Sequence, residues 1–431
     1  MITMEELQAA IKKRINNYND TDFPLQNRDL QTCDLLDSRN HILAQEITST
    51  FDVPRQNLSA MDGYAIAQGS ELSKDSTIDI IGESQAGCAY TGELVVGQGV
   101  RIFTGAVVPD GCDTVIMQEN TNFSDIKDTL DKSQPYAIML SQAAQVDSNI
   151  RSQGEEIESG EVVLKIGKRI NPADISLLAN LGISQVRIFE PLTVGVLATG
   201  DELVAIGSEL TSLAQIYNSN TPTLKSLLSD LPIVIRDYGI VPDNLEQTTA
   251  AVHDAMQDCD VIISTAGVSV GDYDFLTTVI EQLGQINHYK VAMKPGKPFV
   301  FGELNKDIDK PVLYFGLPGN PLSTVVGALQ FVIPALWQMS GADVLEQPMQ
   351  LSIQATLTND IRKSAGRKDF QRGVLSQNAV GSYEVESFTS QQSHRIKQLS
   401  RANCFIVLHK DSGNVSANST VTVQPFPWLY N

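Results

Sequence analysis

The sequence predicts an α/β plus β chain of several domains, among them a doubly wound domain built on a parallel sheet. Three observations support this prediction. Strand-like apolar segments alternate with helix-like segments in residues 191–342. Short β-type segments separated by glycines fill residues 51–149, and β-type segments return in residues 343–431. At roughly 150 residues per domain, the length of 431 residues suggests about three domains.

Residues 1–50 and 150–190 have a helical texture and flank the glycine-rich region. The amino-terminal run MITMEELQAAIKKRIN reads as an amphipathic helix and has no apolar signal core. In the second stretch, Asn171 is suited to cap a helix, Pro172 to occupy its first turn and Gly182 to end it.

Residues 191–342 show the alternation that is typical of βαβ units. Strands of this kind form a parallel sheet, because each crossover helix returns the chain to the same edge. The expected strands are 193–199, 233–239, 260–266 and 312–315, and the expected helices are 219–231, 243–257, 274–284 and about 321–339. After Gly341 the helical signal disappears, and the segments 350–357, 405–410 and 419–426 predict a terminal β domain.

Composition and charge exclude several classes of function as first choices. Lys and Arg total 31 against 51 Asp and Glu, so the net charge is −20 and phosphate backbones and anionic lipid are repelled. We therefore expect neither nucleic acid nor membrane as a partner. The five cysteines form no C-x-x-C pair, which suits a reducing compartment. A cytoplasmic protein is the expectation.

Asp201 and Glu202 follow directly after the strand expected at residues 193–199. In an open parallel sheet, ligands bind outside the carboxyl ends of the strands. Adjacent acids at such a place more often cap a helix and carry a solvated charge. Paired carboxylates are also hard oxygen ligands that suit Mg²⁺. Their spacing alone leaves both interpretations open.

The segment STAGVSVGDYDF, residues 264–275, comes after the next strand and precedes a helix. Glycines, hydroxyls and a helix amino end together can form a cradle for an anion. The residues concerned are Ser264, Thr265, Gly267, Ser269 and Gly271. Asp272 and Asp274 either cap the helix or, with a divalent cation between them and the anion, belong to the site.

Two further turns at the strand ends contain possible anion ligands. Lys290, Lys294 and Lys297 surround a Pro-Gly turn, where they form either a solvated loop or an anion-binding lid. The turn GLPGNP contributes Pro318, Gly319 and Asn320, of which Asn320 could cap a helix or contact a ligand.

Outside residues 191–342, Asp62 lies in the segment SAMDGYAI, an ordinary Asp-Gly turn on spacing alone. The carboxy-terminal region concentrates cations that form either a solvated basic face or part of an anion site. They are Arg367, Lys368, Arg372, Arg395, Lys397 and Arg401.

Together these motifs resemble the molybdopterin molybdenumtransferase family, which includes the carboxy-terminal domain of gephyrin. The similar segments occur in the same order over about residues 30–425. They are SAMDGYA, RIFTGAVVPDGCDTVIMQE, NIRSQGEE, TGDEL, GVSVGDYD, KPGKP, GLPGNP, FQRG and SHRIKQLSRAN. The resemblance implies an elongated subunit with four parts. They are a discontinuous helical domain (1–50 with 150–190), a β-rich insertion (51–149), the doubly wound domain (191–342) and a β barrel (343–431).

The resemblance also implies a reaction. Adenylylated molybdopterin and molybdate give molybdenum cofactor with release of AMP, Mg²⁺ being required. It implies a homodimer with active sites in shared clefts and possible contact with a molybdopterin adenylyltransferase. Asp62 then matches a position critical for catalysis, with Glu202 and Asp274 as further catalytic residues. Asp201, Glu202, Asp272 and Asp274 would hold Mg²⁺.

The substrates would be bound by the residues of the glycine loop, the lysine turn and the GLPGNP turn. These are Ser264, Gly267, Ser269, Gly271, Lys290, Lys294, Lys297, Pro318, Gly319 and Asn320, with Thr104 in the insertion. Glu119 ranks beside Thr104 as a secondary candidate.

This chain departs from the family pattern at three places. Ala266 replaces one of two common glycines, so a methyl group enters the proposed cradle. Glu156 stands where aspartate is frequent, and PRQNLSAMDGYA lacks the aromatic and acidic residues often found before the serine. An adenylyltransferase and a non-catalytic scaffold like gephyrin are the alternatives. The first does not need the SAMDGYA insertion or the terminal β domain, and the second needs no carboxylates at strand ends.

Overall fold

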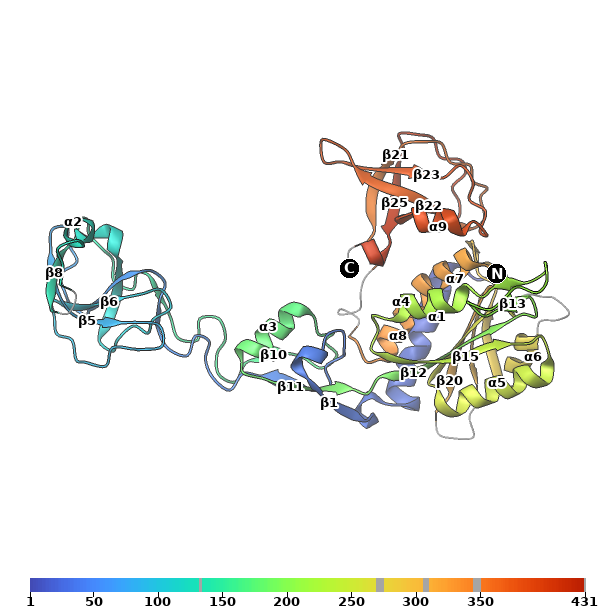
Figure 1. Cartoon of the computed structure of the whole chain (residues 1–431), viewed down its shortest axis with the longest axis horizontal. Helices are drawn as coiled ribbons and strands as arrows, with labels where there is room; N and C mark the ends of the chain where they lie inside the picture. Colours follow the sequence, from blue (N-terminus) through green and yellow to red (C-terminus); the bar gives the residue numbers. More distant parts are fainter. Residues whose placement is uncertain (132–133, 269–274, 305–309, 344–349, 430–431) are drawn as a thin grey trace. The chain divides into compact units, whose positions relative to one another are not determined.

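A computed structural model of the protein describes residues 1–131, 134–268, 275–304, 310–343 and 350–429 (Figure 1). The chain forms two compact units. We call Met1–Gln45 with Ile166–Asn431 the main unit, and Glu46–Lys165 the insertion unit.

The insertion unit is built from short strands, as the glycine-rich texture predicts. Its five-stranded sheet has the order β7-β4-β6-β5-β8. The elements of this unit are β2 (Ile47–Thr48), β3 (Leu58–Ser59), β4 (Gly63–Ala67), β5 (Thr77–Ser84), β6 (Gln98–Ile102), β7 (Cys112–Met117), α2 (Phe123–Ile126), β8 (Tyr136–Met139), β9 (Ile150–Arg151) and β10 (Val162–Leu164). Alternate residues such as Ile78 and Ile80 on β5 are buried, which is the period expected of a strand with one covered face.

The main unit begins with α1 (Met4–Asn17), which starts at a capping box formed by Thr3 and Glu6. The helical texture expected for residues 1–50 ends there. A short π-helical turn over Tyr18–Asp22 and the strand β1 (Leu30–Asp34) follow. The prediction of a largely helical segment was therefore wrong beyond Asn17.

Helix α3 (Pro172–Asn180) has the termini that the sequence predicts. The Asn171 side chain accepts hydrogen bonds from the amides of Ala173 and Asp174, and Gly182 takes a positive φ of 72° after the helix. The rest of 150–190 consists of turns and short strands, and its last strand, β11 (Gln185–Phe189), pairs with β1. Helical texture was thus correct for only part of this stretch.

The central sheet has the order β15-β12-β16-β20-β19-β17. Strands β12 (Leu192–Thr199), β15 (Ile233–Val241), β16 (Val261–Thr265) and β20 (Val312–Leu317) are parallel, as predicted. The edge strand β17 (Gly284–Tyr289) is antiparallel to its neighbour β19 (Val300–Leu304), and β19 is antiparallel to β20. The lysine turn joins β17 to β19 without a crossover helix, so the chain reverses direction there.

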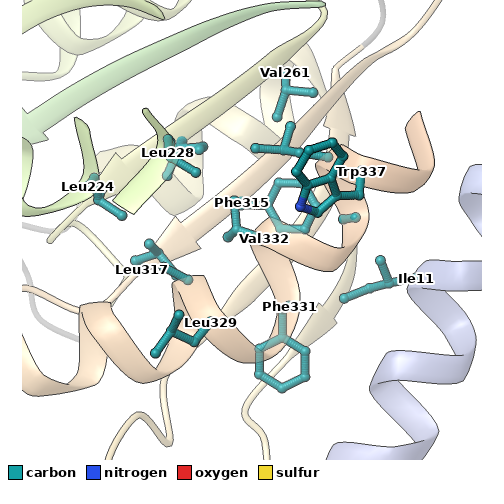
Figure 2. Packing of buried hydrophobic residues seen from close by; sticks show 14 of the residues in the cluster. Ile11, Leu224, Leu228, Val261, Phe315, Leu317, Leu329, Phe331, Val332 and Trp337 are labelled. Carbon is teal, nitrogen blue, oxygen red and sulfur yellow. The ribbon is translucent and has the colours of Figure 1, made fainter. Parts of the chain in front are cut away.

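Helices cover both faces of this sheet, which confirms the doubly wound prediction. Residues of α1, α4 (Asn220–Leu228) and the 321–339 helix pack with Val194, Val261 and Phe315 on one face (Figure 2). Residues of α5 (Leu245–Asp258) and α6 (Phe275–Leu283) pack with Ile262 and Tyr314 on the other. Neighbouring residues of one strand thus face opposite layers.

The long apolar helix at the end of this domain consists of α7 (Pro321–Gly327), a π-helical turn (Ala328–Val332) and α8 (Ile333–Met339). Its length and composition would allow it to cross a membrane. In this fold, however, 89% of its most apolar window is buried inside the protein. Its apolar side chains, Phe331 and Trp337 among them, therefore belong to the core of the sheet domain.

The carboxy-terminal domain, which we call the barrel, closes five strands on themselves. They are β22 (Lys368–Gln377), β23 (Tyr383–Ser387), β21 (Ile353–Leu357), β25 (Thr420–Pro425) and β24 (Cys404–Leu408), and β24 pairs again with β22. The short helix α9 (Ile396–Arg401) within this β domain was not predicted. Strand β18 (Met293–Lys294), from the lysine turn, pairs with β22 outside the closed ring.

Candidate active site

The end of β12 places Asp201 and Glu202 beside the end of β15. Thr199 and Val241 are register partners, and an acid follows each of them by two residues. The Asp243 amide donates to Asp201 Oδ1 at 3.0 Å, and the Asp201 amide donates to Asp243 Oδ2 at 3.4 Å. The two loops are therefore held together by a reciprocal pair of bonds.

Asp243 is a candidate that the sequence analysis missed. Burial raises the pKa of its carboxyl above the usual value, and the charges of Asp201 and Glu202 raise this pKa further. Asp201 and Asp243 thus lie side by side, and Glu202 is near enough for its charge to act on Asp243. The signal in the sequence was weaker than for GDEL, since two residues separate the expected strand 233–239 from the PDN turn.

The end of β16 lies directly beside the end of β12. A Cβ added at Gly267 would lie 2.9 Å from Thr199 Oγ1 and 2.4 Å from Leu276 Cδ1, so only glycine fits there. Ala266 and Gly267 both have a φ of 68°, the left-handed region that favours glycine. The methyl group of Ala266 is therefore held on a strained backbone at the predicted cradle.

Ser264, also predicted to bind substrate, lies in the core. Its side chain is fully buried, and its hydroxyl shares a hydrogen bond of 2.5 Å with the Tyr314 hydroxyl. Because this position leaves no exposed hydroxyl for a substrate, we assign Ser264 to the core. The predicted site residues Ser269, Gly271, Asp272 and Asp274 lie outside the described residues.

The GLPGNP turn reaches the same edge of the sheet. A Cβ added at Gly319 would lie 3.2 Å from the Ala266 Cβ, and the Asn220 side chain donates to the Gly319 carbonyl at 2.8 Å. Asn320 precedes α7 at the N-cap position, but its side chain makes no capping bond. Pro318 is buried, and its carbonyl accepts a bond from the Thr324 hydroxyl. Gly319 is thus the exposed residue of this turn, and Asn320 is half-buried.

The lysine turn is held at both ends. Lys290 has a φ of 76° after β17, and Lys294 lies in β18, which pairs with β22 of the barrel. A Cβ added at Gly296 would lie 3.8 Å from the Ser323 Cβ on α7, so the turn also lies near the GLPGNP turn. Lys297 is exposed. The structure therefore disfavours the interpretation of this segment as a free solvated loop.

In the insertion unit, Asp62 and Thr104 form one local site. The Thr104 amide and hydroxyl both donate to Asp62 Oδ1, at 2.8 and 2.9 Å. These two bonds lower the pKa of the exposed Asp62 carboxyl. The Gln118 amide donates to the Asp62 carbonyl, which brings the exposed Glu119 close in sequence to the same turn.

The carboxy-terminal cations divide into two groups. Arg372 is fully buried, and its guanidinium donates to the carbonyls of Ser390, Gln392 and Arg395. It holds a loop rather than presenting a charge to solvent. The other five predicted cations reach solvent: Arg395, Lys397 and Arg401 are exposed, and Arg367 and Lys368 are half-buried.

The described residues contain no group of three or more His, Cys, Asp or Glu placed to hold a metal ion. Of the four predicted Mg²⁺ ligands, Asp201 and Glu202 are described, and their carboxylates are the hard oxygen donors that Mg²⁺ prefers. The other two, Asp272 and Asp274, lie outside the described residues.

Comparisons with known proteins agree with these features over the whole chain. Residues 2–182 match the family model for the MoeA N-terminal region (domain I and II), residues 195–338 a probable molybdopterin binding domain, and residues 354–426 the MoeA C-terminal region (domain IV). A molybdopterin molybdenumtransferase of Haemophilus influenzae is 39% identical over 429 residues, covering 100% of both chains. Another from Staphylococcus aureus strain COL is 34% identical over 398 residues, covering 90% of this chain and 88% of that protein.

The fold is that of a solved relative as well. The molybdopterin biosynthesis moeA protein from Pyrococcus horikoshii OT3 superposes with a TM-score of 0.79 at 23% identity, covering 99% of this chain and 100% of that one. The matching family models, the full-length relatives and the gathering of strand ends lead to one conclusion. The chain belongs to the molybdopterin molybdenumtransferase family.

Proposed function

We propose that this chain inserts molybdate into adenylylated molybdopterin and releases AMP, as a molybdopterin molybdenumtransferase. The observation that supports this most strongly is the full-length similarity to a protein of that name. The site is consistent with it, because acids and glycine turns follow neighbouring strands at the carboxyl edge of one sheet, and the lysine turn approaches α7, which follows the GLPGNP turn. This is the edge where open α/β sheets bind their ligands.

Charge explains why lysines and a metal would be needed together. The substrates bring a pyrophosphate and a dianion to a protein whose net charge is −20. Phosphate or molybdate oxygens would be bound by Lys290, Lys294 and Lys297. The backbone at Gly267 and Gly319 would lie against the same oxygens. Such preorganised cations and amides stabilise negative charge most where water is excluded.

We propose Asp201 and Glu202 as ligands of Mg²⁺, with Asp272 and Asp274 completing the set. Burial and then the charges of Asp201 and Glu202 raise the pKa of Asp243, and a bound cation would offset the repulsion between these carboxylates. When bound, Mg²⁺ would neutralise substrate oxygens during cleavage of the pyrophosphate bond. Glu202 and Asp274 would contact the reacting groups.

Asp62 is the proposed catalytic carboxylate of the insertion unit. Thr104 donates two hydrogen bonds to one of its oxygens, which keeps the group ionised and fixes its orientation. An ionised carboxylate can act as a general base. It can accept a proton from the water molecule that attacks the pyrophosphate group. Thr104 is then a positioning residue, and Glu119 a secondary candidate.

The homodimer with shared clefts, the contact with a molybdopterin adenylyltransferase and the cytoplasmic location stay predictions of the family resemblance. So does the identity of molybdate as the oxyanion, because tungstate has the same charge and nearly the same shape.

The deciding experiment incubates the purified protein with adenylylated molybdopterin, Mg²⁺ and either oxyanion. We expect AMP release and metal incorporation to rise together. Consumption of ATP with adenylylation of free molybdopterin would instead identify an adenylyltransferase. Binding of the pterin without any turnover would favour a scaffold.

A further inference from the structure

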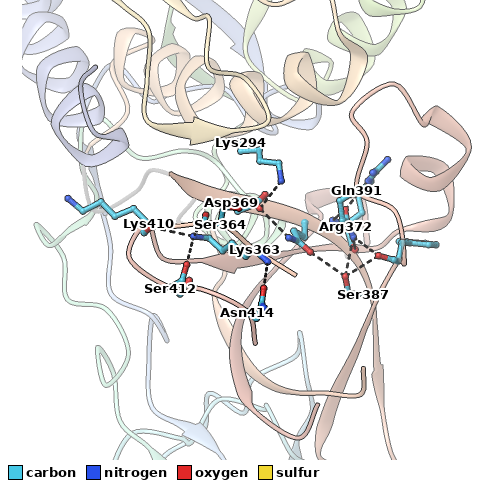
Figure 3. A network of polar contacts seen from close by, with 12 residues as sticks. Lys294, Lys363, Ser364, Asp369, Arg372, Ser387, Gln391, Lys410, Ser412 and Asn414 are labelled. Carbon is cyan, nitrogen blue, oxygen red and sulfur yellow. Dashed lines mark hydrogen bonds and ion pairs between the residues drawn. The ribbon is translucent and has the colours of Figure 1, made fainter. Parts of the chain in front are cut away.

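An ion pair joins the lysine turn to the barrel. Lys294 Nζ lies 3.4 Å from Asp369 Oδ2 (Figure 3), and the two residues are also register partners where β18 pairs with β22. The strand pairing thus fixes the position of the Lys294 backbone, and the Asp369 carboxylate fixes the position of the Lys294 ammonium group. The function proposed for Lys294 does not explain why it should rest on an acid.

The two side chains of this ion pair differ in how far they are exposed to solvent. The Asp369 side chain is 4% exposed, whereas that of Lys294 is 45% exposed. A contact of 3.4 Å is long for a charge-assisted hydrogen bond, whose usual length is about 2.7–2.9 Å. The lysine can therefore leave this contact, because its long side chain is half in solvent, whereas the carboxylate cannot follow it.

A chain of hydrogen bonds fixes Asp369 from behind. Gln371 Nε2 donates to the same Oδ2 at 3.1 Å, and the Ser387 hydroxyl donates to Gln371 Oε1 at 3.4 Å. Gln391 Nε2 donates to the Ser387 hydroxyl at 3.1 Å, and Arg372 Nε donates to Gln391 Oε1 at 3.4 Å. The chain ends at the buried guanidinium that holds the 390–395 loop, so the carboxylate is part of the barrel framework (Figure 3).

A second cation stays near Asp369 when Lys294 moves. Lys363 is 7% exposed, and its ammonium group donates to the carbonyls of Ser364, Lys410 and Ser412. Its charge attracts that of Asp369. Departure of Lys294 would therefore not leave a buried carboxylate without a counter-charge, which would be costly.

We propose that Asp369 is a positioning residue that holds the ammonium group of Lys294 and releases it to an oxyanion substrate. The proposal rests on the role given above to Lys294 as an anion ligand. In the free protein Asp369 partly neutralises that lysine, and substrate must compete with the carboxylate for it. Gln371 limits how strongly Asp369 competes, because it donates to the same oxygen.

The test measures the KM for molybdate from AMP release by the full chain, with adenylylated molybdopterin saturating and ionic strength low. Asp369→Asn removes the competitor, so we expect KM to fall about two- to five-fold, the range that half-exposed ion pairs produce. In a Lys294→Ala background the same change should have no effect on KM. Glu5→Gln is the matched control, because Glu5 pairs with Lys368 beside Asp369 and loses the same charge.

A second variant protects the test against a barrel that unfolds when Asp369 changes. Gln371→Met keeps the carboxylate but removes a competing donor, so Asp369 should bind Lys294 more tightly and KM for molybdate should rise. An unchanged or higher KM in Asp369→Asn, an equal fall in Glu5→Gln, or a full effect of Asp369→Asn without Lys294 would overturn the proposal. If Lys294→Ala alone leaves the KM for molybdate unchanged, Lys294 is not a ligand of molybdate, and the proposal ends with that role.

Discussion

Two candidate sites in this molecule hold their carboxylates by different kinds of contact. At the carboxyl edge of the central sheet, Asp201 and Asp243 meet because their strands are register partners, although they are far apart in sequence. In the insertion unit, Asp62 is held by the amide and hydroxyl of Thr104, which come from a neighbouring loop. The first arrangement raises the pKa of Asp243 and the second lowers that of Asp62. Crowded acids favour a cation, whereas a hydrogen-bonded acid stays ionised without one.

The largest expected effect tests the hydrogen-bonded acid. Asp62→Asn keeps the size of the side chain, so Thr104 can still donate to its amide oxygen and the fold should persist. The variant cannot accept a proton, and we expect AMP release to fall by about 10²–10⁴-fold, as for loss of a general acid or base. Circular dichroism would check the fold, and full insertion activity would remove Asp62 from the mechanism.

The second prediction concerns stability and the glycine that follows Asp62. A Cβ at Gly63 would lie 1.9 Å from the Ile116 carbonyl oxygen, so Gly63→Ala must separate β4 from β7. We expect a loss of about 2–4 kcal/mol, in the range of severe steric changes. Denaturant unfolding would measure it. Gly413→Ala is the control, because Gly413, like Gly63, has no left-handed backbone and its Cβ would meet nothing within 4 Å.

A pair of smaller changes should move the two pKa values in opposite directions. Thr104→Val removes one donor and should raise the pKa of Asp62 toward its usual value. Asp201→Asn removes one negative neighbour and should lower the pKa of Asp243. NMR titration of the side-chain carboxyl carbons would show both, and shifts of the same sign would contradict the contrast between the two sites.

The sign of the linked stability follows from these directions. A carboxyl with a lowered folded pKa contributes stability above its unfolded pKa and loses it as pH falls through the folded value. Thr104→Val should therefore cost stability at neutral pH and less in acid. The raised pKa of Asp243 has the opposite consequence, since its ionised form is disfavoured by folding above that pKa. Asp201→Asn should stabilise the protein at neutral pH, and this gain should shrink below the unfolded pKa.

The sequence predicted the fold where periodicity and local caps determine it. The βαβ alternation and the termini of α3 follow from apolar spacing and from Asn171, Pro172 and Gly182, which act within one turn of the helix. It failed where pairing between distant segments decides. Strands β17 and β19 are antiparallel because a turn replaces a helix, and Leu30–Asp34 is extended because β1 pairs with β11.

The same distinction applies to the site. Asp201, Glu202 and Gly267 could be predicted because they follow strands directly. Asp243 was missed because its strand IVIRDYG ends less clearly before the PDN turn. Ser264 was included because a serine at a strand end looks accessible, but the pleat turns its hydroxyl toward Tyr314. No local pattern shows that Lys294 pairs with Asp369, 75 residues later.

The smallest expected effect is on stability and concerns Ala266. This residue lies at the edge of the central sheet and has a strained backbone. An alanine at a φ of 68° is in a region that costs L-residues about 1–2 kcal/mol, and glycine avoids most of this cost. Glycine also has more freedom in the unfolded chain, which offsets about 0.5–1 kcal/mol. Ala266→Gly should therefore raise the free energy of unfolding by up to about 1 kcal/mol. The adjacent Gly267→Ala should lower it instead, because its Cβ would lie 2.4 Å from Leu276 Cδ1. Urea unfolding of both variants would separate strain from packing, and a loss of stability in Ala266→Gly would mean that contacts of the methyl group outweigh the strain of its backbone.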